Sequence, residues 1–198
     1  MKTKKKLLII LAILLALVIL FLIFRALVEN GLGKRIAEAN ALFVNGTGGQ
    51  PGIAEELEAR LDAADELQYI AAMHDDAVYS EYSALRDTII ALKEQLKAYR
   101  ENGSGDLGRM YELNEALSTQ FTACREALEP ITEGKTHNAL GEYQNAMDEA
   151  QAVIAKSGYN RAIQEFYDTV LNRFPNSLLK GLVKEAAPAL WQSAGGAA

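Results

Sequence analysis

The chain has 198 residues, enough for one ordinary domain with an anchor but too few for two domains with independent cores. Its formal net charge is -6, and no basic stripe with interleaved aromatic residues appears, so nucleic acid is not expected as a partner. One cysteine and two histidines exclude an internal disulfide and a zinc site built on several thiolates, and no cofactor is expected.

A hydrophobic segment flanked by lysines opens the chain. Residues 1–6 form a short basic N-terminus, and the run from Leu7 to Phe24 contains no charged or polar side chain, no glycine and no proline. As a helix this run spans about 27 Å, which nearly matches the hydrocarbon core of a bilayer. We therefore expect residues 7–28 to be a transmembrane helix in contact with lipid and retained as a signal anchor. A cleaved signal peptide is the alternative, but its apolar region is shorter and ends in small residues.

The lysines beside this segment predict its orientation, because basic flanks tend to stay in the cytoplasm. Arg25, Lys34 and Arg35 lie on the other side and reduce the bias. We expect a single-pass protein of the cell membrane with a cytoplasmic N-terminus and an extracytoplasmic domain.

A neck helix and a glycine-rich loop are predicted over residues 29–52. Ile36, Ala39 and Phe43 offer an apolar side to the neck helix. The segment 45–52 holds four glycines and one proline and is predicted to be a loop.

Residues 53–175 are predicted to form an antiparallel up-and-down bundle of three long helices, with the neck as a shorter addition, so the fold class is all-α. The first helix, 53–99, repeats apolar residues every three and four positions, with interruptions at Gln68 and Asp75. Its seam consists of Ala54, Leu57, Leu61, Ala64, Ala71, Val78, Tyr82, Leu85, Ile89, Leu92, Leu96 and Tyr99.

Two further helices complete the predicted bundle. One begins after the Asn102–Gly105 stop, with Asp106 as its N-cap, and ends near Pro130. The other runs from about His137 to Arg173, where Phe174–Pro175 ends it. Short connections between long helices make neighbours antiparallel.

The predicted tail, residues 176–198, carries an apolar patch and a loose end that starts at Trp191. The patch is predicted to contact the membrane surface or a partner helix, or else to pack across the end of the bundle. It consists of Leu178, Leu179, Leu182 and Val183.

Two groups in the bundle have a chemical interpretation beside a structural one. The run His74–Asp75–Asp76 joins an imidazole to two carboxylates, groups that bind divalent cations or transfer protons. Neighbouring helix positions point about 100° apart, so a solvated bend or a stutter in the seam is the favoured interpretation. Asp75, in the seam, is the candidate ligand contact. Cys124 occupies a core position between Phe121 and Leu128 and is predicted to be buried rather than reactive. No catalytic or metal-binding residue is assigned.

The residues 140–183 resemble the closing helix of LemA-family proteins. The resemblance consists of Glu149, the Ala155–Lys156 pair, the Tyr159–Asn160 pair, Tyr167 and the Phe174–Pro175 end, followed by an apolar patch. It implies a bacterial membrane protein with a short basic N-terminus, one membrane helix, a helical bundle and no assigned enzymatic activity. Relatives in magnetosome-forming bacteria are associated with organising a membrane compartment. Tyr159, Asn160, Tyr167 and Phe174 are candidate partner contacts, although packing within the bundle also explains their spacing.

Architecture and resemblance together predict a scaffold or assembly factor of the bacterial envelope that contacts other membrane or envelope proteins, without catalysis. The alternative is an extracytoplasmic sensory or small-ligand-binding helical module. A homo-oligomer is compatible with either function.

Overall fold

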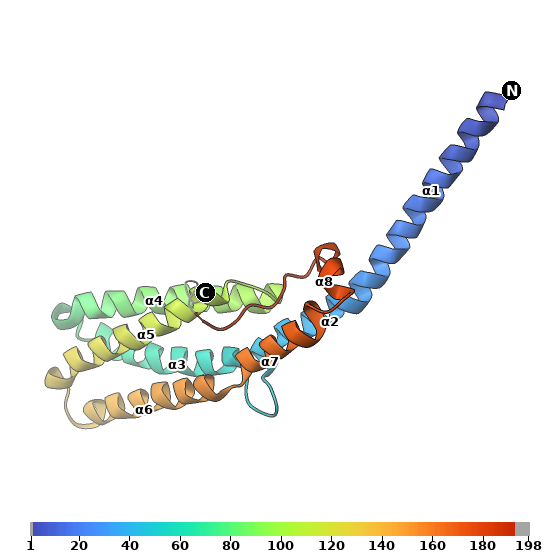
Figure 1. Cartoon of the computed structure of the whole chain (residues 1–198). Coiled ribbons are helices and arrows are strands. Elements are labelled where there is room, and N and C mark those ends of the chain that lie inside the picture. Colours follow the sequence, from blue (N-terminus) through green and yellow to red (C-terminus); the bar gives the residue numbers. More distant parts are fainter. Residues whose placement is uncertain (1, 193–198) are drawn as a thin grey trace. The chain divides into compact units, whose positions relative to one another are not determined.

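The computed structural model describes the backbone of residues 2–192 and the side chains of residues 10–192 except that of Asp75. Every regular element in this part of the chain is helical, which confirms the all-α class (Figure 1). The contacts divide the chain into two compact units. The anchor unit contains the described residues up to Glu38 and the segment Glu165–Ala187, and the bundle unit contains Ala39–Gln164 and the described residues from Pro188 onward.

The anchor unit begins with a helix that is long and apolar enough to cross a membrane. This helix, α1 (Lys2–Val28), continues without a break through a π-helical turn, η1 (Glu29–Gly33), into α2 (Lys34–Asn45). Every large apolar side chain from Ile10 to Phe24 is exposed, as expected of a surface that faces lipid.

The second part of the anchor unit is a chain segment that returns to the end of α1. It contains the π-helical turn η3 (Tyr167–Leu171), the short helix α8 (Asn176–Leu179) and the 3-10 turn η4 (Lys180–Leu182). The buried core of this unit is formed by Val28, Leu32, Ile36 and Leu171. The apolar patch predicted for the tail therefore packs in part on the end of α1 and on η1, through Leu179, Leu182 and Val183.

The bundle unit is built from four long helices rather than the three expected from the sequence: α3 (Ile53–Ala72), α4 (Asp75–Asn102), α5 (Leu107–Leu128) and α6 (Gly134–Lys156). Successive helices run in opposite directions, with α3 packed on α4 and α6 and with α5 packed on α4 (Figure 1). This is an up-and-down bundle, held by apolar side chains at helical spacing. Buried members from the four helices include Leu57, Ala64, Leu85, Leu92, Leu113, Leu117, Phe121, Leu140, Met147 and Ile154.

The predicted single helix over residues 53–99 is wrong, because the chain reverses at Met73 and His74. The amide N–H groups of Met73 and His74 donate to the carbonyls of Ile70 and Ala71, 3.1 and 3.0 Å away, and close the turn. The apolar repeat continues across the turn because α3 and α4 bury their stripes in the same core. The favoured interpretation of the His74 run, a bend in the seam, agrees with this turn.

The predicted helix from His137 to Arg173 is also interrupted. It consists of α6, α7 (Tyr159–Phe166) and η3, with a break at Ser157 and Gly158. Gly158 has a φ of 69°, in the left-handed region where glycine is favoured, and so ends α6. The helix expected after Asp106 is confirmed, and the Asp106 side chain accepts a hydrogen bond from the Arg109 amide at 2.9 Å.

Candidate functional site

The described side chains of the bundle unit do not gather into a metal site. No three His, Cys, Asp or Glu groups in that part of the chain lie close enough together to hold an ion. His74 is partly exposed at the start of α4, and Asp75 is the first residue of that helix, but the Asp75 side chain lies outside the described residues. Cys124 is fully buried, and burial, with a smaller effect of the Glu81 charge, raises the pKa of its thiol to about 11. A thiol in this environment is unreactive at neutral pH.

Five aromatic rings form a cluster at one end of the bundle unit. Phe43 lies at its centre, with ring centroids 4.6 Å from Tyr99, 5.9 Å from Tyr159 and 5.7 Å from Trp191. Tyr111 continues the cluster, 5.5 Å from Trp191. We call these five residues the aromatic cluster. The Tyr99 hydroxyl donates to the Asn40 carbonyl at 2.9 Å, and burial raises the Tyr99 pKa to about 12, so this phenol remains neutral in the physiological range.

The Tyr159–Asn160 pair, a candidate partner contact from the sequence, binds the chain's own C-terminal segment. The side-chain amide of Asn160 donates to the backbone carbonyl of Trp191 at 3.0 Å and accepts from the backbone N–H of Trp191 at 2.7 Å. The Tyr159 hydroxyl donates to the Ala189 carbonyl at 2.9 Å, and its side chain is buried. The expectation of a loose end from Trp191 is wrong for Trp191 itself, which is 7 % exposed. The residues after Gln192 lie outside the described part.

A hollow of ≈ 520 Å³ lies beside the aromatic cluster. Tyr111, Trp191 and Ile53 contribute apolar surface, and Lys156 and Arg161 add positive charge. Such a lining suits a small molecule with an apolar or aromatic part and a negative charge. We call this the aromatic hollow.

A buried arginine links three helices of the bundle, and sequence reasoning missed it. Arg60 of α3 is 2 % exposed and donates to Asn114 of α5, to Ser118 at 2.5 Å and to Gln151 of α6 at 2.7 Å. Burial lowers the Arg60 pKa to about 10 against the opposing charges of Glu115 and Asp148, so the guanidinium is still charged at neutral pH.

The signal for Arg60 was a second buried stripe along α3. This helix contacts α4, α5 and α6, so its apolar face is wider than a heptad seam. Arg60 lies in that stripe with Ile53, Ala63, Leu67 and Ile70.

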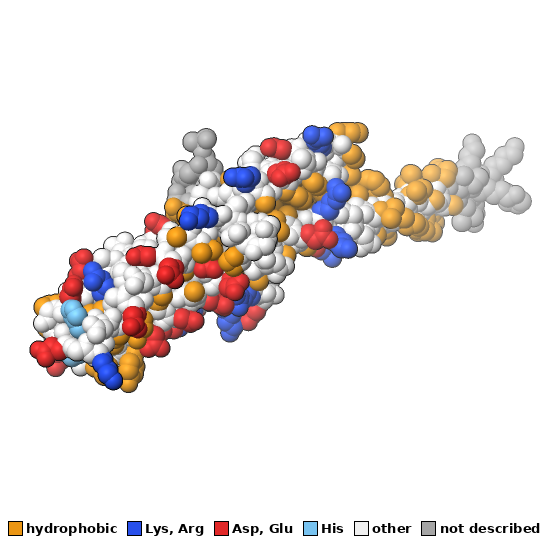
Figure 2. Space-filling model, turned by 90° about the horizontal axis from the view of Figure 1, so that it is seen from below, with side chains coloured by type: hydrophobic (Ala, Val, Ile, Leu, Met, Phe, Trp, Pro, Cys, Tyr) orange, Lys and Arg blue, Asp and Glu red, His pale blue; other side chains and the backbone are white. Residues whose placement is uncertain are grey.

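Three large side chains are exposed around the α3–α4 turn. Tyr69 lies on the last turn of α3 and is 67 % exposed, and Met73 directly follows that helix and is 59 % exposed. Tyr79, near the start of α4, is 65 % exposed. We call these three residues the tip patch. Figure 2 shows hydrophobic side chains at this end of the bundle unit among acidic and basic ones. Aromatic and methionine side chains are enriched at protein interfaces, where they supply most of the binding energy.

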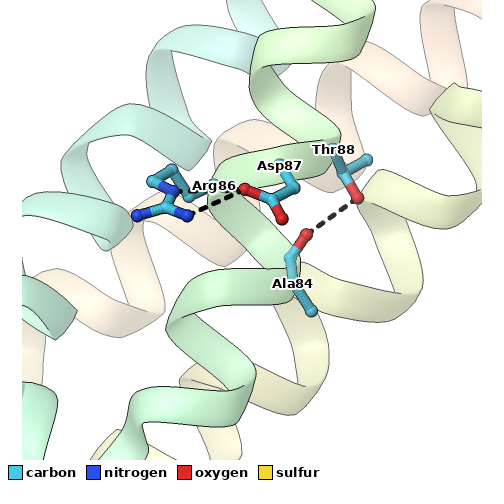
Figure 3. Close-up of polar contacts among 4 residues, drawn as sticks. All are labelled: Ala84, Arg86, Asp87 and Thr88. Atoms are coloured by element: carbon cyan, nitrogen blue, oxygen red, sulfur yellow. Dashed lines mark hydrogen bonds and ion pairs between the residues drawn. The ribbon is translucent and has the colours of Figure 1, made fainter.

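The middle of α4, by contrast, satisfies its polar groups locally. Arg86 forms an exposed ion pair with Asp87 at 3.0 Å, and the Thr88 hydroxyl donates to the Ala84 carbonyl at 2.9 Å (Figure 3). The Arg86 guanidinium also lies 5.8 Å from the centre of the Tyr82 ring. These are ordinary contacts of a solvated helix face.

The other two candidate contacts, Tyr167 and Phe174, lie in the anchor unit. Tyr167 is half-buried against the core of that unit, and burial raises its pKa. Phe174 is 82 % exposed. The five candidates from the sequence therefore do not form one site.

Comparison of the chain with family models, with curated proteins and with solved structures finds no match in any of the three.

Proposed function

We propose that the chain is a membrane-anchored scaffold or assembly factor of the bacterial envelope, which binds other envelope proteins through its helical bundle and carries out no catalysis. The observation that carries this proposal is the tip patch, where Tyr69, Met73 and Tyr79 are exposed on a bundle whose other large apolar side chains are mostly buried. Exposed aromatic and methionine residues at a turn between rigid helices are suited to binding a protein surface.

Anchorage and orientation are part of the proposal. The exposed apolar surface from Ile10 to Phe24 supports insertion in the cell membrane, and the lysines of residues 1–6 support a cytoplasmic N-terminus. The LemA-like pattern of Tyr159–Asn160 and Phe174–Pro175 supports membership of that family, whose members are bacterial membrane proteins.

Affinity purification of the full chain from bacterial membranes tests the proposal. A tip variant with Tyr69→Ser, Met73→Ser and Tyr79→Ser is compared with a control that changes the exposed Glu94, Lys97 and Glu142 to serine. We expect a reproducible set of envelope proteins with the unchanged chain and the control, and its loss with the tip variant. Equal sets with both variants, or no enriched protein at all, contradict the proposal, provided that Trp191 emission and membrane fractionation are unchanged.

The second candidate function is a small-ligand-binding or sensory module, and the aromatic hollow favours it. Lys156 and Arg161 would bind an anionic group while Tyr111 and Trp191 contact the apolar part of the ligand. Trp191 is the only tryptophan, so its fluorescence reports binding directly. Titration with a panel of aromatic carboxylates should give a saturable change that Arg161→Gln weakens; no change with any of them would leave the scaffold as the single proposal.

A further inference from the structure

A short segment of the anchor unit is packed directly on the end of the membrane helix. Leu179, Leu182 and Val183 lie against the core formed by Val28 and Leu32. The Lys184 N–H also donates to the Glu29 carboxylate at 3.3 Å, which ties the segment to the first turn beyond α1. The segment is therefore held where the apolar helix ends.

The same segment exposes large apolar side chains. Phe174 is 82 % exposed and Leu178 is 73 % exposed, more than any large apolar residue described in α1. Leu179 and Asn176 of this segment line a hollow of ≈ 380 Å³, together with Phe24 and Leu27. Phe24 and Leu27 belong to the membrane helix, so the apolar surface of the segment continues the apolar surface of α1.

The charges of the segment favour a negatively charged surface. Between residues 173 and 184 the chain contains Arg173, Lys180 and Lys184 and no acidic residue, although the whole chain has more acidic than basic residues. Arg35 adds a further cation at the rim of the hollow. Apolar side chains interleaved with cations are typical of segments that lie in the interface of an anionic membrane.

We propose that residues 173–184 lie in the membrane interface on the side where α1 leaves the bilayer, with Phe174 and Leu178 inserted beside the lipid chains and with a lipid occupying the adjacent hollow. Arg173, Lys180 and Lys184 contact lipid phosphates. The occupant is lipid rather than protein because the hollow is lined by Phe24 and Leu27 of α1 and by one cation, Arg35, and because the segment beside it carries three more cations. This inference rests on the membrane anchorage in the proposed function and adds a second contact with the bilayer, distinct from the span.

Depth-dependent quenching in vesicles tests this contact on the full chain. In a Cys124→Ala background, single cysteines replace Phe174 or Leu178, carry an environment-sensitive fluorophore and are reconstituted in phosphatidylcholine–phosphatidylglycerol vesicles. A probe at Leu20→Cys measures the environment of the proposed membrane-spanning helix, and a probe at Glu142→Cys measures that of an exposed position in the bundle unit. We expect strong quenching by lipid-borne nitroxides at Phe174 and Leu178 and several-fold weaker quenching by aqueous iodide than at Glu142. Trp191 emission confirms that each variant keeps its bundle unit.

The other outcomes separate this inference from the proposed function. Lipid quenching at Leu20 with iodide quenching at Phe174 and Leu178 overturns the interfacial contact but leaves the anchor. Protection of Phe174 and Leu178 from both quenchers means that protein covers them, and also overturns it. Iodide quenching at Leu20 removes the anchor, and both proposals fail. Unchanged lipid quenching at Leu178 without phosphatidylglycerol contradicts the role of the three cations.

Discussion

Arg60 is the residue on which the packing of three helices depends. Its guanidinium donates to the side-chain oxygens of Asn114, which is fully buried, and of Gln151, which is partly buried, and the Asn114 amide also donates to Gln151. Deleting one member of a buried polar network leaves the others without partners, whereas replacing the whole network by apolar groups of similar volume is often close to neutral. We therefore expect the network to specify which helices meet and in which register more than it adds to stability.

Arg60→Ala should lower the free energy of unfolding by about 2 to 4 kcal/mol, because it leaves a cavity and removes the hydrogen bonds that the guanidinium donates to Asn114, Ser118 and Gln151. The triple variant Arg60→Met, Asn114→Leu and Gln151→Met should lie within about 1 kcal/mol of the unchanged chain. Urea unfolding in mild detergent, followed by Trp191 emission, measures both. Arg109→Ala, on the exposed face of α5, is the control. Equal stability of Arg60→Ala and this control would contradict the role of the buried Arg60 network in the packing of the bundle.

Cys124 makes a pH-dependent contribution to the free energy of unfolding, and the burial of its thiol determines the sign of that contribution. The thiol pKa is about 11 in the folded chain against an ordinary value of 9.0, so folding favours the protonated form. The contribution is complete below pH 9 and is lost as the pH rises toward 11. At pH 8 the native chain should react with a thiol reagent far more slowly than the chain unfolded in urea, and Cys124→Ala should show a smaller loss of stability between pH 9 and pH 11. Rapid labelling of the native chain at pH 8 contradicts the burial.

Among the elements, α7 binds the C-terminal segment through two side chains, and Asn160 makes both hydrogen bonds to Trp191. Asn160→Ala removes both hydrogen bonds to the Trp191 backbone, each worth about 0.5 to 1.5 kcal/mol, and should release Trp191 from the aromatic cluster. We expect a red shift of Trp191 emission and greater access to acrylamide. Asn145→Ala, at an exposed position of α6, should leave both unchanged. Identical emission of the two variants would show that packing alone holds Trp191.

Replacing either of two glycines by alanine should change the stability of the fold, but in opposite directions. A Cβ on Gly52, at the start of α3, would lie 2.1 Å from the Val44 carbonyl oxygen, so the loop before α3 must shift. Gly141 lies on the exposed face of α6 with nothing within 4 Å of an added Cβ. Gly52→Ala should destabilise by about 2 kcal/mol and Gly141→Ala should stabilise by about 0.5 to 1 kcal/mol. Thermal unfolding followed by circular dichroism distinguishes the loss of stability from the gain. Destabilisation by both variants would contradict the open position of Gly141 on α6.

The positions of the helices show which physical signals a sequence carries. The apolar repeat identified the buried faces of α3 to α6, since burial requires that spacing, and Asp106 identified the start of α5. The reversal at Met73 and His74 was missed because neither glycine nor proline marks it and the repeat runs through it. The break at Gly158 was visible as a glycine, but glycine within a helical pattern is often tolerated.

At the scale of the whole molecule, the long apolar helix at the N-terminus was readable because its run from Leu7 to Phe24 contains no polar side chain, no glycine and no proline. The return of residues 165–187 to the end of α1 was not, since contacts between distant short turns leave no periodic signal. For the same reason the candidate residues Tyr159 and Asn160 could be identified but not their partners, the backbone groups of Ala189 and Trp191. The tip patch was missed because exposure of Tyr69, Met73 and Tyr79 depends on the turn that the repeat conceals.

The central claim is that this membrane-anchored bundle binds envelope proteins through its tip patch, and photocrosslinking in living bacteria tests it most directly. A photoreactive amino acid replaces Tyr79 in the full chain, and a matched variant carries it at Glu142 on the exposed face of α6. We expect the same few envelope proteins to be crosslinked from position 79 in every repeat, with little product from position 142. Equal background from both positions would contradict the claim.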